Sequence, residues 1–257
     1  YYGLVRLAQL QRGERVLIHA AAGGVGLAAI QIAQQMGAEV FATAGSDPKR
    51  DFLRSLGVRH VFNSRTLDFA DQSMEATQHQ GVDVVLNSLP GDAIGKSLSL
   101  LRAYGRFLEI GKTDIYQNRM IGLLPFQDNL SYFAIDLDRL LRQRPDTVRD
   151  LFAEVMEYVA RGDYGPLPLT EFPAEQTAEA FRYMAQRKNI GKVVVAIRGD
   201  AASAAREAAV SEAAARSKGT RQRRQRQARH REKETAQGER KLMQPTFTSS
   251  RILLPVR

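Results

Sequence analysis

Residues 15–36 read RVLIHAAAGGVGLAAIQIAQQM, and this stretch decides the fold. Its first part, Arg15–Ala20, is a short apolar run that predicts a buried strand. Its last part, Gly26–Met36, has helical periodicity, and the glycines between the two parts indicate a tight turn. The stretch approaches the length of a membrane span, but His19, the glycine pair and Gln31 favour a buried strand that turns into a helix.

The turn between these two elements has the pattern of a dinucleotide-binding loop. Its sequence, Ala21-Ala22-Gly23-Gly24-Val25-Gly26, is Gly-x-Gly-x-x-Gly with alanine in the first place. Gly23 lets the backbone approach a pyrophosphate, and Gly26 lets the helix pack closely on the strand. The free N–H groups and the dipole at the helix start favour negative charge. We therefore expect cofactor contacts from Ala22, Gly23, Gly24, Val25 and Gly26; a glycine-rich turn without a ligand is the alternative.

Residues 1–200 alternate short apolar runs with helical stretches, which is typical of βαβ units and a parallel sheet. Runs such as Val82–Asn87 are almost continuously apolar, as in strands that are covered on both faces. The pattern predicts an α/β fold with a doubly wound parallel sheet. The expected strands are Arg15–Ala20, Glu39–Ala44, His60–Asn63, Val82–Asn87, Gly105–Ile110 and Leu130–Ile135. The expected helices are Gly26–Met36, Pro48–Leu56, Asp92–Leu101 and Thr147–Ala160.

The composition excludes several classes of protein. The chain has 257 residues, a net charge of +9, and neither cysteine nor tryptophan. A disulfide-stapled secreted domain, a structural zinc module and a fibrous chain are therefore excluded. The lack of cysteine, together with the lack of a signal-peptide pattern at the N-terminus, favours the cytoplasm. We expect no membrane association.

The excess positive charge lies in one segment. Residues 201–257 contain 14 Lys and Arg against 5 Asp and Glu, which accounts for the whole net charge. From 201 to 240 the only large aliphatic or aromatic residue is Val210, so the segment cannot bury enough apolar surface to fold. We expect a folded domain over 1–198 and a low-complexity, basic, disordered tail over 199–257. A linker or translated remnant is favoured over the alternative, an Arg-rich nucleic-acid-binding segment.

The end of the second expected strand bears on the choice of cofactor. An NAD-preferring site has an acidic residue about 20 residues beyond the glycine pattern, against the ribose hydroxyls. Here Gly45 and Ser46 leave room for a 2′-phosphate, and Lys49 and Arg65 can neutralise it. NADP is therefore the expected cofactor. In the alternative, Asp47 takes the acidic role, or the Ser-Asp-Pro run that contains it caps the next helix.

Gly91–Ser97 looks like a phosphate-binding P-loop, because it lies between an expected strand and an expected helix and ends in Lys96-Ser97. The spacing is one residue short of that motif, however, and three residues between the glycines cannot wrap around a phosphate. We expect Lys96 to be a solvated helix residue.

Polar residues follow the fifth and sixth expected strands. Ligands of open α/β sheets bind beyond the carboxyl ends of the strands, so Lys112 and Asp136 are expected to face the nicotinamide end of the cofactor. Each residue has an ordinary alternative role. Lys112 would be an exposed loop lysine, and Asp136 the N-cap of the following helix; both roles of Asp136 can coexist.

Five segments resemble the enoylreductase domain of type I polyketide and fatty acid synthases. The resemblance covers almost all of residues 1–198 and rests on residues 19–26, 63–65, 84–89, 105–112 and 189–195. It implies a Rossmann fold of the zinc-free, quinone-reductase-like branch of the medium-chain dehydrogenases/reductases, with no metal site. It also implies NADPH-dependent reduction of a trans-2-enoyl thioester on an acyl carrier protein. Hydride would go to the β-carbon and a proton to the α-carbon.

The resemblance also assigns roles to individual residues. It implies that Lys112 and Asp136 form the catalytic proton-donor pair and that Ser46, Lys49 and Arg65 bind the 2′-phosphate. The cofactor's ribose and nicotinamide would lie against the residues at the ends of two strands, which are Asn87, Ser88, Leu89, Ile110 and Gly111. The implied partners are the acyl carrier protein, the neighbouring synthase domains and a second copy of the chain.

The chain departs from the family's pattern at both ends. The family's substrate-binding domain, which precedes this part, is largely missing, and Leu167–Ile197 is expected to be a remnant that returns to it. We therefore expect an N-terminally truncated fragment whose activity on its own is uncertain. Two alternatives remain, namely a zinc-free quinone or enone reductase acting on a free small molecule, and an inactive nucleotide-binding fragment with a nucleic-acid-binding tail.

Overall fold

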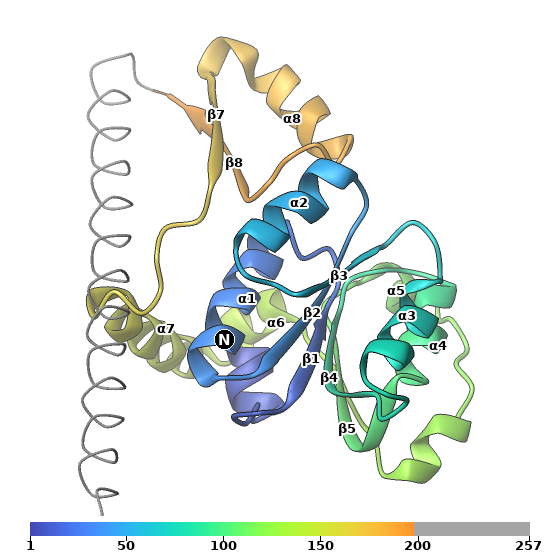
Figure 1. Ribbon diagram of the computed structural model, residues 1–257. Helices are drawn as coiled ribbons and strands as arrows, with labels where there is room; N and C mark the ends of the chain where they lie inside the picture. The colour runs from blue at the N-terminus through green and yellow to red at the C-terminus, as the bar shows by residue number, and fades with distance from the viewer. Residues whose placement is uncertain (198–257) are drawn as a thin grey trace, which may run out of the picture. The chain divides into compact units, whose positions relative to one another are not determined.

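Six parallel strands form one sheet in the order β3-β2-β1-β4-β5-β6 (Figure 1). The computed structural model describes residues 1–197, and the expected disordered tail, 199–257, lies outside them. The strand order reverses between β1 and β4, so the sheet is doubly wound, as the sequence predicts. The strands are β1 Arg15–Ile18, β2 Glu39–Ala44, β3 His60–Asn63, β4 Val82–Asn87, β5 Leu101–Glu109 and β6 Ser131–Ala134.

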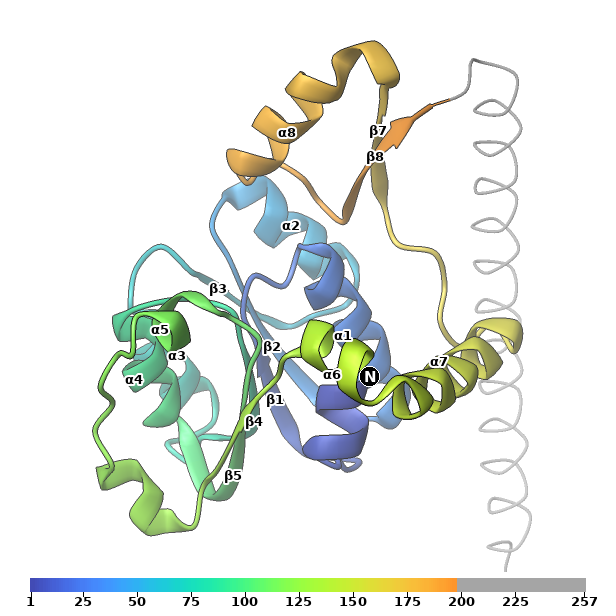
Figure 2. The ribbon, with the colours of Figure 1, turned by 180° about the vertical axis from the view of Figure 1, so that it is seen from behind.

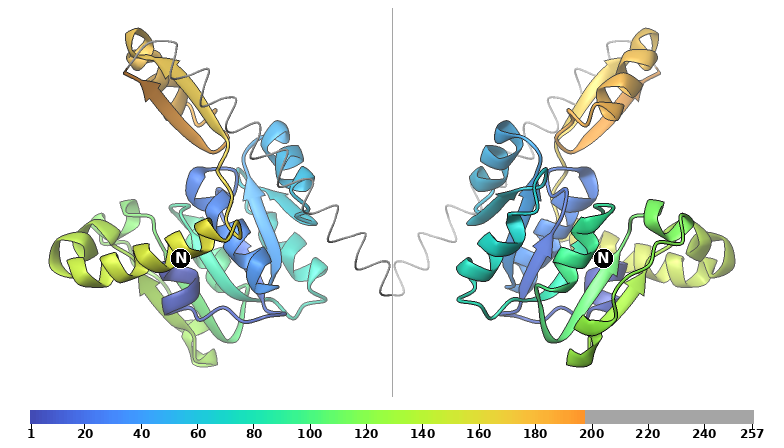
Figure 3. Two further views of the ribbon diagram at one scale, coloured as in Figure 1. Left: turned by 90° about the vertical axis from the view of Figure 1, so that its left-hand side faces the viewer. Right: turned by 90° about the vertical axis from the view of Figure 1, so that its right-hand side faces the viewer.

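The alternation of side chains along the strands builds one hydrophobic core on each face of the sheet. Val16 and Ile18 of β1 belong to one cluster with Ile30 of α1 and Leu53 of α2. Leu17, between them, belongs to a second cluster with residues of α3 and α4. Helices therefore cover both faces, with α1 and α2 on one side and α3 and α4 on the other (Figure 3). This burial explains why the strands are almost continuously apolar.

The connections between the strands are mostly helical. The described helices are η1 Tyr2–Leu7, α1 Gly24–Met36, α2 Asp47–Ser55, α3 Phe69–Ala76, α4 Asp92–Leu98, α5 Thr113–Tyr116, η2 Leu124–Asp128, α6 Leu137–Gln143, α7 Pro145–Ala160, η3 Ala174–Gln176 and α8 Thr177–Ala185. All four helices expected from the sequence are present. Among residues 1–197, none of the helices combines the length and the apolar composition that crossing a bilayer requires.

The sequence prediction is wrong about the junction of α4 and β5. The helix expected to reach Leu101 ends at Leu98, and β5 begins at Leu101 rather than at Gly105. The reason is a bulge in the ladder, because Val82 pairs with Leu101 while Val84 pairs with Arg106. Residues 102–104 are exposed, so their pattern does not look like a strand.

A second, two-stranded parallel sheet follows α7. It consists of β7 Leu169–Pro173 and β8 Lys192–Ala196, with α8 between them (Figure 2). Gly191, just before β8, forms a bridge to Gly23 and donates its N–H to the Ala22 carbonyl at 2.8 Å. Its φ is +72°, and a Cβ there would lie 2.0 Å from the Pro168 carbonyl oxygen. Glycine is therefore required where this segment joins the glycine turn.

His19, directly after β1, is a buried polar residue with a structural role. It is 3% exposed, its Nδ1 lies 2.9 Å from Thr43 Oγ1, and its Nε2 lies 2.8 Å from Ser97 Oγ. The ring also packs edge-on against Phe69. Burial lowers the pKa of His19 to about 3. The neutral ring thus links β1, β2 and α4.

We expect His19 to make the fold sensitive to acid. Unfolded His19 takes up a proton below pH 6.5, whereas the folded ring does so only near pH 3. Its contribution to the free energy of unfolding is therefore complete above pH 6.5 and decreases by about 1.4 kcal/mol per pH unit as the pH falls toward 3. Urea unfolding at pH 7.5, 5.5 and 4.5 measures this slope. His19→Gln should flatten it, while His60→Gln, at a partly exposed position, should leave it in place; equal slopes in all three proteins would contradict the assignment.

Candidate cofactor-binding and active site

The carboxyl ends of β1, β4, β5 and β6 lie side by side at one edge of the sheet. Hydrogen bonds continue the ladder past the strand ends, from His19 N–H to the Leu86 carbonyl at 3.0 Å and from Ile110 N–H to the Asn87 carbonyl at 3.0 Å. Ile135 N–H likewise donates to the Glu109 carbonyl at 2.8 Å. This edge brings together the glycine turn and the residues that the sequence places after the later strands.

The glycines of the turn differ in how closely other atoms of the protein approach them. A Cβ on Gly26 would lie 2.5 Å from the Cα and carbonyl oxygen of Ala21, so packing of α1 on the turn requires glycine there. A Cβ on Gly23 would meet only the Ala20 carbonyl oxygen at 3.3 Å, and one on Gly24 would meet the flexible end of Lys192. Internal packing therefore requires Gly26, while Gly23 leaves room for a ligand and the space over Gly24 is taken by the end of Lys192.

The two other residues expected in this turn differ in exposure. Ala22 is buried, and its carbonyl accepts the bond from Gly191. Val25 is 56% exposed at the first turn of α1. The side chain of Val25 therefore lies on the open side of the turn, and Ala22 offers mainly its backbone.

Cations gather at the ends of β2 and β3. Lys49 Nζ donates to the Arg187 carbonyl at 2.8 Å, and Arg65 Nε donates to the Gly45 carbonyl at 2.5 Å. Burial, and then the positive charges of Arg187 and Arg65, lower the pKa of Lys49. The structure thus brings Lys49 and Arg65 together, as expected, and adds Arg187, which the sequence analysis missed. Arg187 carries no local motif and comes from a segment more than a hundred residues away.

Ser46 and Asp47 begin the helix α2. Ser46 occupies the N-cap position, yet its hydroxyl makes no capping hydrogen bond. Asp47 pairs with Arg50, and its side chain is 85% exposed. Neither residue caps α2 through its side chain, and the assignment of Ser46 to the 2′-phosphate stays a prediction.

A buried hydrogen-bond network joins the ends of β4 and β5. Asn87 Nδ2 donates to Glu109 Oε2 at 2.6 Å and to the Leu89 carbonyl at 2.9 Å, and Asn87 Oδ1 accepts from Leu89 N–H at 3.1 Å. Glu109 Oε1 accepts from Gly111 N–H at 2.5 Å. The side chain of Asn87 is therefore fully engaged within the protein, and it shapes the turn that carries Ser88 and Leu89.

Glu109 is a site residue that the sequence analysis missed. It is 2% exposed, and burial raises its pKa. The available signal was a carboxylate within the otherwise apolar run Phe107–Ile110, since charged residues are rarely buried without partners. Glu109 fixes the positions of Gly111 and of the residues that follow it.

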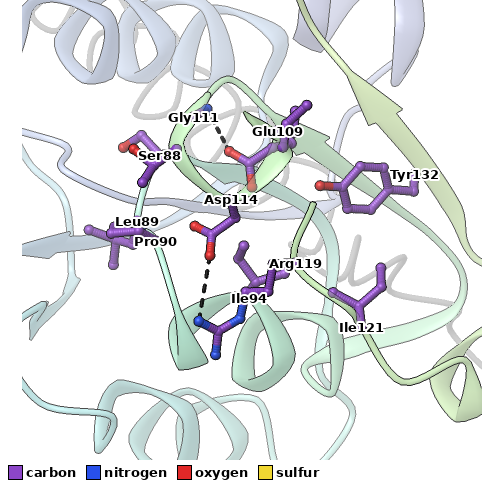
Figure 4. Close-up of a pocket in the computed structure, with 12 residues that line it drawn as sticks. Ser88, Leu89, Pro90, Ile94, Glu109, Gly111, Asp114, Arg119, Ile121 and Tyr132 are labelled. Atoms are coloured by element: carbon purple, nitrogen blue, oxygen red, sulfur yellow. Dashed lines mark hydrogen bonds and ion pairs between the residues drawn. The ribbon is translucent and has the colours of Figure 1, made fainter. Parts of the chain in front are cut away.

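A pocket of about 150 Å³ opens behind these two strand ends (Figure 4). Ser88, Leu89 and Gly111 line one part of it, and Asp114, Arg119 and Tyr132 another. Burial, with the negative charges of Glu109 and Asp114, raises the pKa of Tyr132 to about 12. The charged side chains of the pocket lining are Glu109, Asp114 and Arg119, and Arg119 Nη1 lies 3.6 Å from Asp114 Oδ1.

The P-loop-like segment is engaged within the protein. Gly91 N–H donates to both carboxylate oxygens of Asp114, at 3.2 and 3.1 Å, and Ser97 is buried against His19. Lys96 is exposed on α4, as expected. The Gly91 N–H and the Ser97 hydroxyl, two groups that a P-loop would offer to a phosphate, are thus hydrogen-bonded within the protein.

Lys112 and Asp136 form an ion pair across the ends of β5 and β6. Lys112 Nζ lies 2.9 Å from Asp136 Oδ2 and donates to the Ile135 carbonyl at 3.2 Å. Asp136 Oδ1 accepts from Arg139 N–H at 2.9 Å, so Asp136 is also the N-cap of α6. That backbone N–H first, and the Lys112 ammonium second, lower the pKa of Asp136. Both side chains remain about a third exposed and can reach a ligand.

Within residues 1–197, no group of three or more His, Asp or Glu side chains could hold a metal ion, and the chain has no cysteine. The absence of a metal site remains a prediction for the chain as a whole.

These features are those of a Rossmann-like α/β fold with polar groups at the carboxyl edge of its sheet, and comparison with known proteins identifies the family. Residues 56–195, more than half of the chain, match the family model of the zinc-binding dehydrogenases. A phenolphthiocerol/phthiocerol polyketide synthase of Mycobacterium tuberculosis is 45% identical over 197 residues, which are 77% of this chain and 9% of that protein. The chain thus spans only a small part of the curated relatives that it matches.

Solved structures narrow the assignment. The CurK enoyl reductase is 49% identical with a TM-score of 0.69, over 77% of this chain and 58% of that one. The nucleotide-binding subdomain of the enoylreductase domain of PpsC from Mycobacterium tuberculosis is 46% identical with a TM-score of 0.61, over 63% of this chain and 90% of that one. The chain belongs to the zinc-binding dehydrogenase family and, within it, to the enoyl reductase domains of polyketide synthases. Its lineage is that of an oxidoreductase with a nicotinamide cofactor, and its relatives are domains of multidomain synthases.

Proposed function

We propose that this chain supplies the cofactor-binding half of an NADPH-dependent enoyl reductase, which reduces a trans-2-enoyl thioester carried on an acyl carrier protein. The observation that carries the proposal is the Lys112–Asp136 pair, at 2.9 Å, on the same sheet edge as the glycine turn. A nucleotide fold alone would not need a charged pair at this position, beyond the two strands that would face the nicotinamide.

The residues at this edge fit a dinucleotide. Gly23 leaves the start of α1 open, and the N–H groups there suit a pyrophosphate. Ser88, Leu89, Ile110 and Gly111 would lie along the nicotinamide ribose and ring, on the turns that the Asn87–Glu109 network holds. When bound, the cofactor supplies the hydride that is added to the β-carbon of the enoyl chain.

The preference for NADPH rests on Ser46, Lys49 and Arg65. Arg65 donates to the Gly45 carbonyl, its positive charge acts on Lys49, and no carboxylate among residues 1–197 forms an ion pair with either cation. A 2′-phosphate would supply the missing negative charge.

Lys49→Ala tests this preference. Because only NADPH carries the 2′-phosphate, we expect the variant to bind NADPH about tenfold more weakly while its affinity for NADH changes little. Calorimetric titration of the wild-type chain and the variant with both nucleotides measures the difference. Equal losses for the two nucleotides would contradict the 2′-phosphate assignment, and no binding of either by the wild-type chain would contradict the proposed function.

Lys112 and Asp136 have complementary roles in the proposed reaction. Hydride addition at the β-carbon places negative charge on the thioester oxygen and the α-carbon. The Lys112 ammonium would stabilise this charge and donate a proton to the α-carbon, which completes the reduction. Asp136 would hold the ammonium in place and keep it charged.

The proposal includes the partners of the reaction. The substrate would arrive on an acyl carrier protein of the same synthase, and a substrate-binding domain would complete the pocket. A homodimer and a cytoplasmic location belong to the same proposal.

A further inference from the structure

Glu109, the last residue of β5, is a buried carboxylate that lacks a cationic partner in the described chain. Its side chain accepts hydrogen bonds from Asn87 Nδ2 at 2.6 Å and from Gly111 N–H at 2.5 Å, and both donors are neutral amides. Among residues 1–197, no lysine, arginine or histidine forms an ion pair with this carboxylate, although Glu109 is only 2% exposed. Buried charges are normally paired with an opposite charge, so Glu109 is an exception.

The hydrogen bonds of Glu109 suit its ionised form. Asn87 Nδ2 and Gly111 N–H can only donate, and each of them meets a different carboxylate oxygen. Burial, the largest influence, raises the pKa of Glu109, the two hydrogen bonds lower it, and the negative charge of Asp114 raises it. The charge of Glu109 also contributes, after burial, to the raised pKa of Tyr132 across the pocket. A negative charge thus lies at the end of β5 and acts on groups around it.

Glu109 adjoins the residues that the proposed function assigns to the nicotinamide. It lines the pocket of Figure 4 together with Ser88, Leu89 and Gly111. A Cβ built on Gly111 would lie 2.8 Å from Glu109 Oε1, so the carboxylate is in direct contact with this glycine. The charge of Glu109 is therefore next to the position proposed for the ring.

The other charges near this position already have partners. Lys112 Nζ lies 2.9 Å from Asp136 Oδ2, and Arg119 Nη1 lies 3.6 Å from Asp114 Oδ1. The charge of Glu109 is thus left uncompensated within the described residues, and a cationic ligand group would balance it.

The oxidised and reduced cofactors differ in the charge of this ring. The ring is neutral in NADPH and positively charged in NADP⁺, because the hydride that goes to the β-carbon of the enoyl chain takes its electron pair with it. A fixed, buried negative charge beside the ring therefore favours the oxidised form and the positive charge that develops during hydride transfer.

We propose that the buried carboxylate of Glu109 acts through its charge on the nicotinamide ring and stabilises the positive charge of the oxidised cofactor. This inference rests on the proposed function and adds a residue to it. Glu109 exchanges no proton with the substrate in this role; it makes the release of hydride more favourable.

The affinities of the full chain for NADP⁺ and NADPH, measured by calorimetric titration, test this role. The two forms share the adenosine, the pyrophosphate and the 2′-phosphate, so the ratio of their affinities isolates the ring. Glu109→Gln removes the charge and should shift this ratio about tenfold in favour of NADPH. Glu109→Asp keeps the charge and should retain most of the wild-type ratio. Glu39→Gln, at the start of β2, is the matched control and should leave the ratio unchanged.

A second nucleotide, 2′,5′-ADP, distinguishes an electrostatic effect from a loss of structure. It lacks the nicotinamide, so Glu109→Gln should bind it as tightly as the wild-type chain does. If the wild-type chain binds the nucleotides and Glu109→Gln has the wild-type ratio, the role of Glu109 is wrong and the proposed function stands. If the wild-type chain binds neither NADP⁺ nor NADPH, both are wrong.

A further pair of variants decides the question if Glu109→Gln no longer binds 2′,5′-ADP. The new amide of Glu109→Gln would face Asn87 Nδ2, donor against donor. Adding Asn87→Ser replaces that donor with a hydroxyl, which can accept from the amide. The double variant should then differ about tenfold in ratio from Asn87→Ser alone, and equal ratios in the two would contradict the role of Glu109.

Discussion

Gly26→Ala is expected to destabilise the fold severely. The added methyl group would lie 2.5 Å from the Cα and carbonyl oxygen of Ala21, and backbone atoms cannot move aside as a side chain can. Overpacking of this kind costs about 3 kcal/mol of unfolding free energy, or roughly 10 °C in Tm for a domain of this size. Thermal unfolding followed by circular dichroism measures the change. A Tm within about 2 °C of wild type would mean that α1 can withdraw from the turn at little cost.

Gly23→Ala is the matched control three residues earlier. Its Cβ would meet only the Ala20 carbonyl oxygen at 3.3 Å, and its φ of −79° is accessible to alanine. We expect a Tm close to wild type but weaker binding of NADPH, because the methyl group would point into the space left for the pyrophosphate. The pair thus separates the glycine that the fold needs from the glycine that the ligand needs.

Lys112→Ala is expected to lower turnover about 10²-fold, because a positioned proton donor contributes at least this factor. The assay requires a complete substrate pocket, so the chain would be joined to the substrate-binding part of a related enoyl reductase. The affinity for NADPH should change little, since Lys112 contacts Asp136 and the Ile135 carbonyl rather than the glycine turn. A parallel loss of NADPH affinity would instead identify Lys112 as a cofactor ligand.

Two substitutions of Asp136 separate its catalytic role from its capping role. Asp136→Asn keeps an oxygen that can accept from Arg139 N–H but loses the charge that faces Lys112. The Asp136→Asn variant should therefore be more stable than Asp136→Ala and yet lose activity as strongly.

The fold lowers the pKa of Asp136. Its stabilising contribution is therefore present at neutral pH and is lost as the pH falls below the ordinary pKa range of an aspartate.

The sheet and the first helix could be predicted because their determinants are local. An apolar strand, a glycine turn and an amphipathic helix follow one another within residues 15–36, and each strand expected later in the chain has the same apolar character. The register of β5 could not be predicted, because the bulge after Leu101 depends on how Val82 pairs across the sheet.

The site residues also divide into those that a local sequence pattern predicts and those that depend on tertiary contacts. Lys112 and Asp136 follow strands, so the rule that ligands bind at carboxyl ends of strands finds both of them. Arg187 and Lys192 reach the edge through tertiary contacts with Lys49 and Gly24, which no local pattern encodes. Glu109 lies between these cases, since its sequence context is unusual but its partners are set by the pairing of β4 and β5.

The bond between Gly191 and Ala22 has a consequence for the order in which the molecule forms. During synthesis the glycine turn leaves the ribosome long before residue 191 is made. The Ala22 carbonyl therefore lacks its hydrogen-bond donor, the Gly191 N–H, until the later segment has been synthesised. The six strands of the main sheet are all complete by residue 134 and can pair first. The nucleotide edge would therefore be finished only by the last part of the described chain, after the sheet beneath it has already assembled.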